Sequence, residues 1–137
     1  MGWTGGGKAL VLRDAYDPRR RERVWWIDPK SPEKRTTLYA RSTEGVYDAP
    51  GRPLTRSVGH ARQLWTSKDG SAIYLAGDGF RADGQRPFLD RVELGSGKHT
   101  RVFESAGDVL EQPVAVLSDD GKRFVTLRQS NKQAPNY

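Results

Sequence analysis

The sequence predicts an all-β fold, and three observations support this prediction. The chain of 137 residues contains 15 glycines and eight prolines, so turns are frequent. Short apolar runs lie between those turns, as in sheets of short strands. No window keeps apolar residues at the i, i+3, i+4 and i+7 positions of an amphipathic helix. Residues 109–117 come nearest to that spacing, and Pro113 interrupts them.

Three segments repeat one pattern along the chain. Each starts at an apolar residue (Trp3, Trp65 or Leu117), passes through a glycine-containing turn and continues into an apolar run. Asp-Gly pairs are strong hairpin signals, because Asp can hydrogen-bond the backbone two residues on and Gly accepts a positive φ. The residues predicted to form these structural turns are Gly7, Asp69, Gly70, Asp120 and Gly121.

Further strands are predicted between the turns. In the first segment, residues 24–29 form a strand that ends at a proline, and residues 35–40 form the returning strand. In the second segment, residues 87–94 and 100–104 form a hairpin. Alternation places four residues of its first strand on one face, namely Phe88, Asp90, Val92 and Leu94. The stretch over residues 42–59 is predicted to be irregular, with one short strand.

Repeated antiparallel meanders of this length are typical of the blades of a β-propeller. The expected blade-like units cover about residues 3–60, 61–110 and 111–137, and the last unit is truncated. A closed propeller needs at least four blades of about 40–50 residues. The chain therefore corresponds to an incomplete β-propeller of two to three blades. Because an open stack exposes sheet faces and edges, we expect a dimer or higher homo-oligomer that buries them.

Composition excludes several kinds of site. The chain has no cysteine, so it can form neither a disulfide nor a thiolate metal site. Its two histidines, His60 and His99, lack the spacing of metal ligands, and His99 is expected to be exposed after a hairpin turn. Residues 77–85 are acidic and glycine-rich but lack the ligand pattern of a calcium loop, so a wide loop is expected. The sequence predicts no catalytic residue, no metal ligand and no cofactor.

The net charge of +6 raises the question of an acidic partner. The densest basic run, residues 19–23, is interrupted by Glu22 and flanked by aspartates, which favours a solvated hairpin loop over a phosphate-binding patch. No run approaches the roughly 18 apolar residues that span a bilayer, so no membrane partner is expected. The first residues lack the pattern of a signal peptide. A bacterial periplasmic and a cytoplasmic location both stay open.

Four motifs resemble the propeller of bacterial and plastid peptidases of the prolyl oligopeptidase family. They lie at residues 3–11 (WTGGGKALV), 26–29 (WIDP), 47–55 (YDAPGRPLT) and 112–121 (QPVAVLSDDG). The resemblance is strongest to the glutamyl endopeptidase-like branch, whose members are often named dipeptidyl aminopeptidase or acylaminoacyl peptidase. The motif at residues 47–55 is the most specific, because it lies between repeats, where generic propellers share no pattern.

The resemblance implies a propeller that precedes an α/β-hydrolase domain with a Ser-Asp-His triad, covers its active site and filters peptide substrates. This chain contains no Gly-x-Ser-x-Gly nucleophile motif. We therefore expect it to be non-catalytic by itself, a fragment whose partners are the hydrolase domain and the peptide substrates of a parent serine peptidase.

Two other functions stay open beside that one. The first is a protein-binding or self-assembling propeller fragment, and the second is weak nucleic-acid binding through the basic loop. Trp25 and Trp26 are neighbours on a predicted strand and therefore point to opposite faces. One is expected to pack between blades, and the other to face solvent or a partner.

Overall fold

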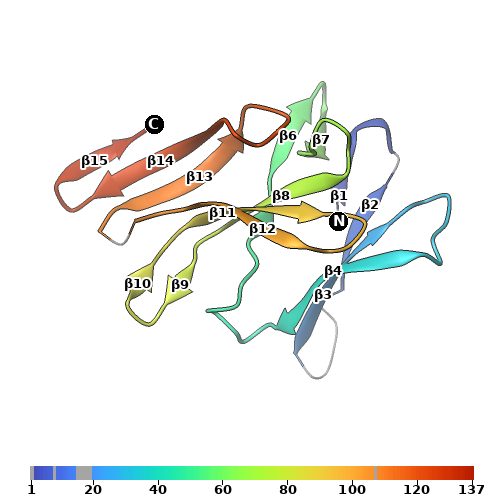
Figure 1. Ribbon diagram of the computed structural model, residues 1–137, viewed down its shortest axis with the longest axis horizontal. Helices are drawn as coiled ribbons and strands as arrows, with labels where there is room; N and C mark the ends of the chain where they lie inside the picture. The colour runs from blue at the N-terminus through green and yellow to red at the C-terminus, as the bar shows by residue number, and fades with distance from the viewer. Residues whose placement is uncertain (1, 8, 15–19, 107) are drawn as a thin grey trace.

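The computed structural model describes residues 2–7, 9–14, 20–106 and 108–137, and these residues form an all-β protein. Figure 1 shows three antiparallel sheets side by side, with two short hairpins attached. The described residues contain no α-helix, and a single 3-10 turn lies at Gly5–Gly7. The predicted fold class is confirmed, since separate meander sheets that do not close into a barrel agree with an incomplete propeller.

The first sheet is a meander with strand order β1-β2-β3-β4. Its predicted central hairpin corresponds to β3 and β4, and the register between them skips Leu38 between the pairs Val24–Tyr39 and Trp25–Thr37. Leu38 is thus the extra residue of a β-bulge, which frees backbone groups from the ladder. The strands are β1 (Gly2–Trp3), β2 (Leu10–Asp14), β3 (Arg21–Ile27) and β4 (Arg35–Ser42).

The second sheet has the order β5-β8-β11-β12 and occupies the middle of the molecule (Figure 1). Its edge strand β5 pairs Pro53 with Leu75 of β8. Proline cannot donate to a ladder, so an edge is where a sheet tolerates it. The strands are β5 (Arg52–Pro53), β8 (Ala72–Gly77), β11 (Phe88–Glu93) and β12 (His99–Glu104).

The third sheet has the order β13-β14-β15, and two hairpins, β6-β7 and β9-β10, complete the fold. The expected wide loop at residues 77–85 is wrong, because positive-φ glycines at Gly79 and Gly84 let the chain fold into the β9-β10 hairpin. The stretch over residues 42–59 holds two strands, β5 and β6, where one was expected. The remaining strands are β6 (Thr55–Val58), β7 (Ala61–Leu64), β9 (Phe80–Arg81), β10 (Gly84–Gln85), β13 (Leu110–Val116), β14 (Phe124–Ser130) and β15 (Gln133–Asn136).

Two hydrophobic clusters cover the two faces of the second sheet. The cluster toward the first sheet contains Val24, Leu38, Leu64, Ile73, Leu75, Val92 and Leu94, with Trp26 and Tyr39 packed against it. The cluster toward the third sheet contains Tyr74, Leu89 and Val116, with Leu54, Trp65, Phe103 and Phe124 packed against it. Successive residues of β8 alternate between the clusters, so the strand is apolar on both faces, as buried strands are.

The turns of the second and third segments share one hydrogen-bond pattern. In the second segment, the Asp69 carboxylate accepts hydrogen bonds from Ser67 Oγ (2.6 Å) and Ser71 N (3.1 Å). In the third, Asp120 accepts from Ser118 Oγ (2.5 Å) and Lys122 N (3.0 Å). These bonds lower the pKa of both carboxyl groups, that of Asp69 to about 2, and the largest contribution in each turn comes from its serine hydroxyl.

The first segment keeps only the backbone part of this turn. Gly7 N donates to Thr4 O (3.2 Å), as Gly70 N donates to Ser67 O (2.9 Å). The turn glycines Gly7, Gly70 and Gly121 all have positive φ, of 60°, 71° and 74°. A glycine, Gly6, precedes Gly7 where the other two turns have their aspartates, and it has no side chain to accept a bond. The division into units 3–60, 61–110 and 111–137 stays a prediction.

Candidate functional site

The connection between β4 and β5, residues 43–51, forms a wall between two cavities. It contains the start of the YDAPGRPLT motif, and Ala49 and Pro50 line both cavities. The connection reaches the second sheet through Gly51, whose φ is +86°. A Cβ at Gly51 would lie 2.6 Å from the carbonyl oxygen of Ala76, so only glycine lets the backbone approach β8 this closely.

The first cavity has a volume of about 740 Å³, which is in the range of small-molecule and peptide side-chain pockets. It lies between the first sheet, the connection and the end of β8. Apolar side chains form much of its wall, among them Val24, Val46, Pro53, Leu64 and Phe80. Its charged residues are Glu22, Arg41, Arg52, Arg62 and Asp78, so the cavity combines apolar walls with several polar groups.

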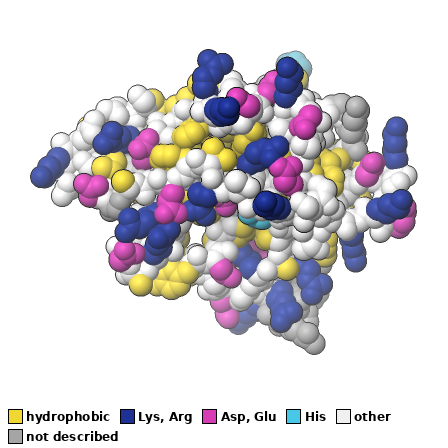
Figure 2. Space-filling model, in the orientation of Figure 1, with side chains coloured by type: hydrophobic (Ala, Val, Ile, Leu, Met, Phe, Trp, Pro, Cys, Tyr) yellow, Lys and Arg dark blue, Asp and Glu magenta, His cyan; other side chains and the backbone are white. Residues whose placement is uncertain are grey.

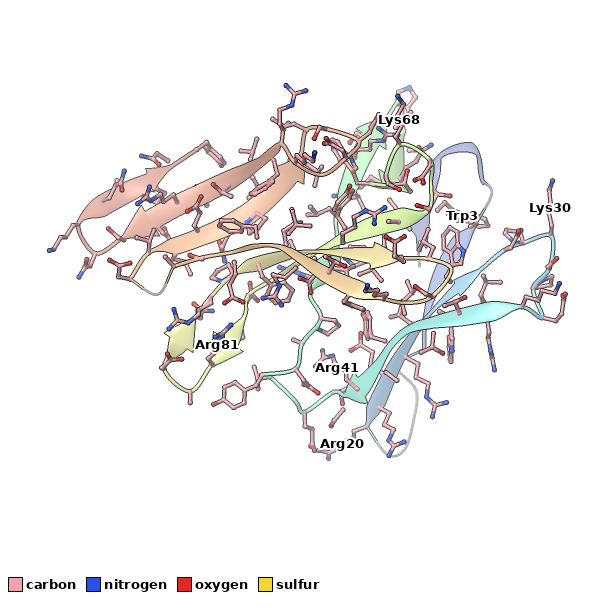
Figure 3. The ribbon with its side chains drawn as sticks, in the orientation of Figure 1. Trp3, Arg20, Lys30, Arg41, Lys68 and Arg81 are labelled. Carbon is pink, nitrogen blue, oxygen red and sulfur yellow. The ribbon has the colours of Figure 1, made fainter. Side chains whose placement is uncertain are left out.

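A buried ion pair lies at the first cavity. The side chain of Glu22 is 4% exposed, and its carboxylate lies 3.3 Å from Arg41 Nη2 and accepts a hydrogen bond from Tyr39 Oη at 3.2 Å. Arg41 also donates from Nη1 to the carbonyl of Gly45 at 2.6 Å, which ties the connection to β4. Figure 3 shows Arg41 between β4 and the connection, with Arg81 on the other side of the connection. Removal of one partner of such a pair leaves a buried charge and costs about 3–5 kcal/mol.

The second cavity, of about 360 Å³, is more polar and lies between the connection, the β9-β10 hairpin and the outer half of the second sheet. Asp90 of β11 is 6% exposed and faces this cavity. Arg101 Nε donates to Asp90 Oδ1 at 2.5 Å, and the Arg101 guanidinium lies 4.0 Å from the centre of the Phe88 ring. Burial disfavours the charged form of Asp90, but the neighbouring His99 and the hydrogen bond from Arg101 outweigh burial and lower the pKa of Asp90.

The expected exposure of His99 is wrong, because the turn before it lies against the first sheet. Its side chain is 30% exposed, and Nε2 lies 3.0 Å from the carbonyl oxygen of Leu38, the bulge residue of β4. Nδ1 faces Asp90 Oδ2 at 3.9 Å. The Asp90 carboxylate raises the pKa of His99, with support from the Leu38 carbonyl, against the opposing effects of burial and Arg101.

The two predicted partner-contact residues lie on opposite faces of β3. Trp26 packs against the cluster between the first and second sheets. Trp25 pairs with exposed Thr37, and the Arg35 guanidinium lies 5.0 Å from the centre of its ring. Trp25 therefore belongs to the outer face of the first sheet, and a partner contact there stays a prediction. The turn residues named above lie at the sheet ends, away from both cavities.

The basic run lies partly outside the described residues, since residues 15–19 are not described. Arg20 forms an ion pair with Glu44, while Arg21 and Arg23 are exposed on β3. On the side shown in Figure 2, Lys and Arg side chains gather over the lower ends of β3 and β4 and around the β9-β10 hairpin, with Asp and Glu among them. This mixed surface does not present a continuous basic patch on that side.

Sequence reasoning missed the charged residues of both cavities, although signals for some of them were present. Glu22 and Arg41 gave no such signal, because they face each other only through the register of β3 and β4. Asp90 is a charged residue on the otherwise apolar face of a predicted strand, which is a signal of a buried polar contact. Among the described residues, no group of three or more His, Cys, Asp or Glu is placed to hold a metal ion. The described part of the chain also has no helix that is both long and apolar enough to cross a bilayer.

Comparison with known proteins relates the whole chain to part of two plant peptidases. It is 30% identical over 152 aligned residues to a probable chloroplastic glutamyl endopeptidase of Arabidopsis thaliana, and 29% identical over 149 to one of Oryza sativa subsp. japonica. The alignments cover 100% and 98% of this chain. No known family profile and no solved structure matches the chain. The chain spans 16% of the length of these relatives, so it is similar to one region of proteins named as peptidases.

Proposed function

We propose that this chain is a non-catalytic β-propeller segment of a serine peptidase, which gates or filters peptide substrates for a separate hydrolase domain. The observation that carries the proposal is the similarity of the full chain to one region of two glutamyl endopeptidases. Three meander sheets stacked face to face, as blades stack in a propeller, support it. The cavities on both sides of the connection supply space in which a peptide can lie.

The first test is made on the chain itself. We expect no hydrolysis when the purified chain is incubated with a mixture of peptides and the products are followed by mass spectrometry. Robust hydrolysis that serine-directed inhibitors stop would contradict a non-catalytic role. The reading frame from which the chain comes is then sequenced, and we expect it to encode a Gly-x-Ser-x-Gly hydrolase domain after this segment. A frame without such a domain would contradict the proposal.

The second test addresses filtering, in the full-length peptidase. Ala49→Trp adds bulk to the wall that both cavities share. A filter predicts slower cleavage of long peptides with little change for a short chromogenic substrate. The matched control is Val58→Trp, which adds the same side chain at an exposed position, 45% exposed, that lines neither cavity. An equal loss for long and short substrates would contradict filtering.

Self-assembly is a second candidate function, and the third sheet favours it. Val114 of β13 and Leu117, which follows β13, are 43% and 58% exposed, and β15 at the opposite edge of the sheet is exposed throughout. Exposed apolar residues near an unpaired edge can be covered by another copy of the chain. Sedimentation at high concentration is expected to show dimers or larger species, and monodisperse monomers would contradict this candidate.

A further inference from the structure

The bulge of β4 and the turn before β12 meet at the boundary between the first and second sheets. Thr36 Oγ1 donates to the carbonyl of Gly95 at 3.3 Å. Gly97 has a φ of +70°, and a Cβ there would lie 2.5 Å from the carbonyl oxygen of Thr37, so the two backbones are in close contact. The turn therefore docks on β4 at residues 36–38, immediately before His99.

His99 continues this contact with a group that can change its charge. Leu38 is the bulge residue, so its carbonyl is available to a neighbouring sheet, and His99 Nε2 lies 3.0 Å from it. A carbonyl oxygen and a carboxylate only accept hydrogen bonds, so each ring nitrogen of His99 faces an acceptor. Neutral histidine carries a single N–H, so it leaves either Nε2 against the Leu38 carbonyl or Nδ1 against the Asp90 carboxylate, 3.9 Å away, without a proton, whereas protonated histidine directs an N–H at both.

We propose that His99 is a pH-sensitive latch that holds the first sheet against the second, closed when its imidazole is protonated and loosened when it is neutral. Both partners needed for the closed state are in place, the Leu38 carbonyl on the first sheet and the buried Asp90 carboxylate on the second. His99 also lines the second cavity, so loosening of the latch changes the width of that cavity. This inference does not depend on the proposed peptidase role.

The other charged groups near His99 do not supply a competing switch at the contact itself. Arg101 of β12 is bound to Asp90 and opposes protonation of His99. From β4 the imidazole meets the backbone carbonyl of Leu38. The remaining titratable or charged groups around the same cavity are Tyr47, Asp48, Arg81, Arg86 and Glu104. Arg81 and Arg86 have carboxylate partners of their own, Glu104 and Asp83.

The sign of the pH dependence follows from the directions of the two pKa shifts. The pKa of His99 is raised in the folded chain. Its stabilising contribution is therefore complete below the ordinary histidine value of about 6.5 and is lost as the pH rises through the folded value. The pKa of Asp90 is lowered, so its contribution is complete above about 4 and is lost only in stronger acid. The latch is fully closed between about pH 4 and pH 6.5 and loosens as the pH rises through the folded pKa of His99.

The test compares the wild-type chain with three variants. Because the chain has only two histidines, His60 can serve as the control for His99. The variants are His99→Gln, His60→Gln and Asp90→Asn; His60 is exposed on the β6-β7 turn and serves as the matched control. NMR titration of the imidazole C2 protons, assigned with the His60→Gln variant, is expected to give His99 a pKa above the ordinary value. Asp90→Asn should move it downward. A His99 titration at or below the ordinary value, or one that Asp90→Asn leaves unchanged, would overturn the latch.

Stability against pH gives the second measurement. In wild type and in His60→Gln, the urea midpoint should fall between pH 6 and pH 8.5, and His99→Gln should lose that fall. The amides of β4 next to Leu38 should exchange roughly five- to tenfold faster at pH 8.5 than at pH 6 after correction for intrinsic rates, the factor expected for one hydrogen bond. A wild-type pH profile in His99→Gln would overturn the proposal. If His99→Gln does not fold, the titration of Asp90→Asn decides alone.

Discussion

The second and third sheets are both antiparallel meanders, but they differ in what covers them. In the second sheet, Ala72, Ile73, Tyr74 and Leu75 are successive residues of β8, and each is at most 1% exposed. In the third sheet, no residue of β14 is fully buried, and β15 is exposed throughout. The local sequence patterns are alike, so the difference comes from neighbours: the second sheet has a sheet on each face, and the third has one.

This comparison indicates that stability is concentrated in the middle of the stack. A strand covered on both faces removes apolar surface from water on each side, at about 25 cal/mol per Å². A strand covered on one face gains about half as much. The described structure therefore predicts a gradient, in which the same substitution costs more in the second sheet than in the third. The predictions below test that gradient, from the largest effect to the smallest.

The largest effect is expected from a matched pair of leucines. Leu89 of β11 is fully buried between the sheets, whereas Leu127 of β14 is half-buried. Leu89→Ala should lower the free energy of unfolding by about 2–5 kcal/mol, because it removes buried methyl groups and leaves a cavity. Leu127→Ala should cost about 1 kcal/mol. Urea denaturation with unchanged m-values measures the free energy of unfolding of both variants. Equal losses of stability in the two variants would contradict the gradient.

The next effect concerns the edge of the second sheet at Gly51. Gly51→Ala forces a Cβ to within 2.6 Å of the Ala76 carbonyl at a positive φ, and it should cost about 1–3 kcal/mol. The control is Gly59→Ala, also at a positive φ (59°) but with no atom within 4 Å of the new Cβ. The control should cost about 1 kcal/mol, from backbone strain alone. If both variants are equally stable in thermal denaturation, that result would contradict the close contact between Gly51 and the backbone of β8.

A smaller effect is expected in acid from the turn that leads into β8. The folded pKa of Asp69 is about 2, below its ordinary value of 3.8, so its contribution is present above pH 3.8 and is lost as the pH falls toward 2. Asp69→Asn removes this titration, so the stability difference between wild type and the variant should shrink between pH 4 and pH 2. Circular dichroism during acid titration measures it. A difference that stays constant over this range would show that the carboxylate does not hold the turn.

The smallest effect on folding is expected at the uncovered end of the stack. Leu117 is 58% exposed, so Leu117→Asp should change the free energy of unfolding by less than about 0.5 kcal/mol. If copies of the chain associate through this end, the same substitution should shift sedimentation toward monomers. A variant that stays associated would place the contact elsewhere on the surface.

Local patterns predicted the fold class and its turns but not how the sheets meet. Asp-Gly pairs and period-two alternation act within a few residues, and β11 shows the predicted alternation of Phe88, Asp90 and Val92 along one of its faces. The contact of His99 with Leu38 joins residues 61 positions apart. It depends on a bulge in β4, which has no local sequence signal, and on the docking of the turn before β12 against β4, which the spacing of that predicted turn does not show.

The cavities were hidden from sequence reasoning for a similar reason. The YDAPGRPLT motif was recognisable as specific, but nothing in its spacing shows that Gly51 lies on the backbone of β8. The pairing of Glu22 with Arg41 depends on the register of β3 and β4. From the sequence alone, Arg41 would be expected to be an exposed charged residue. Long-range packing determines which charged residues become buried, and alternation alone does not identify them.

Native-state hydrogen exchange at single-residue level tests the three-sheet stack most directly. We predict the slowest exchange for the amides of β8 and β11, intermediate rates for β3, β4, β13 and β14, and the fastest for β15, since protection follows burial. Uniform protection across the three sheets, or the strongest protection in the third sheet, would contradict a stack whose stability lies in its middle.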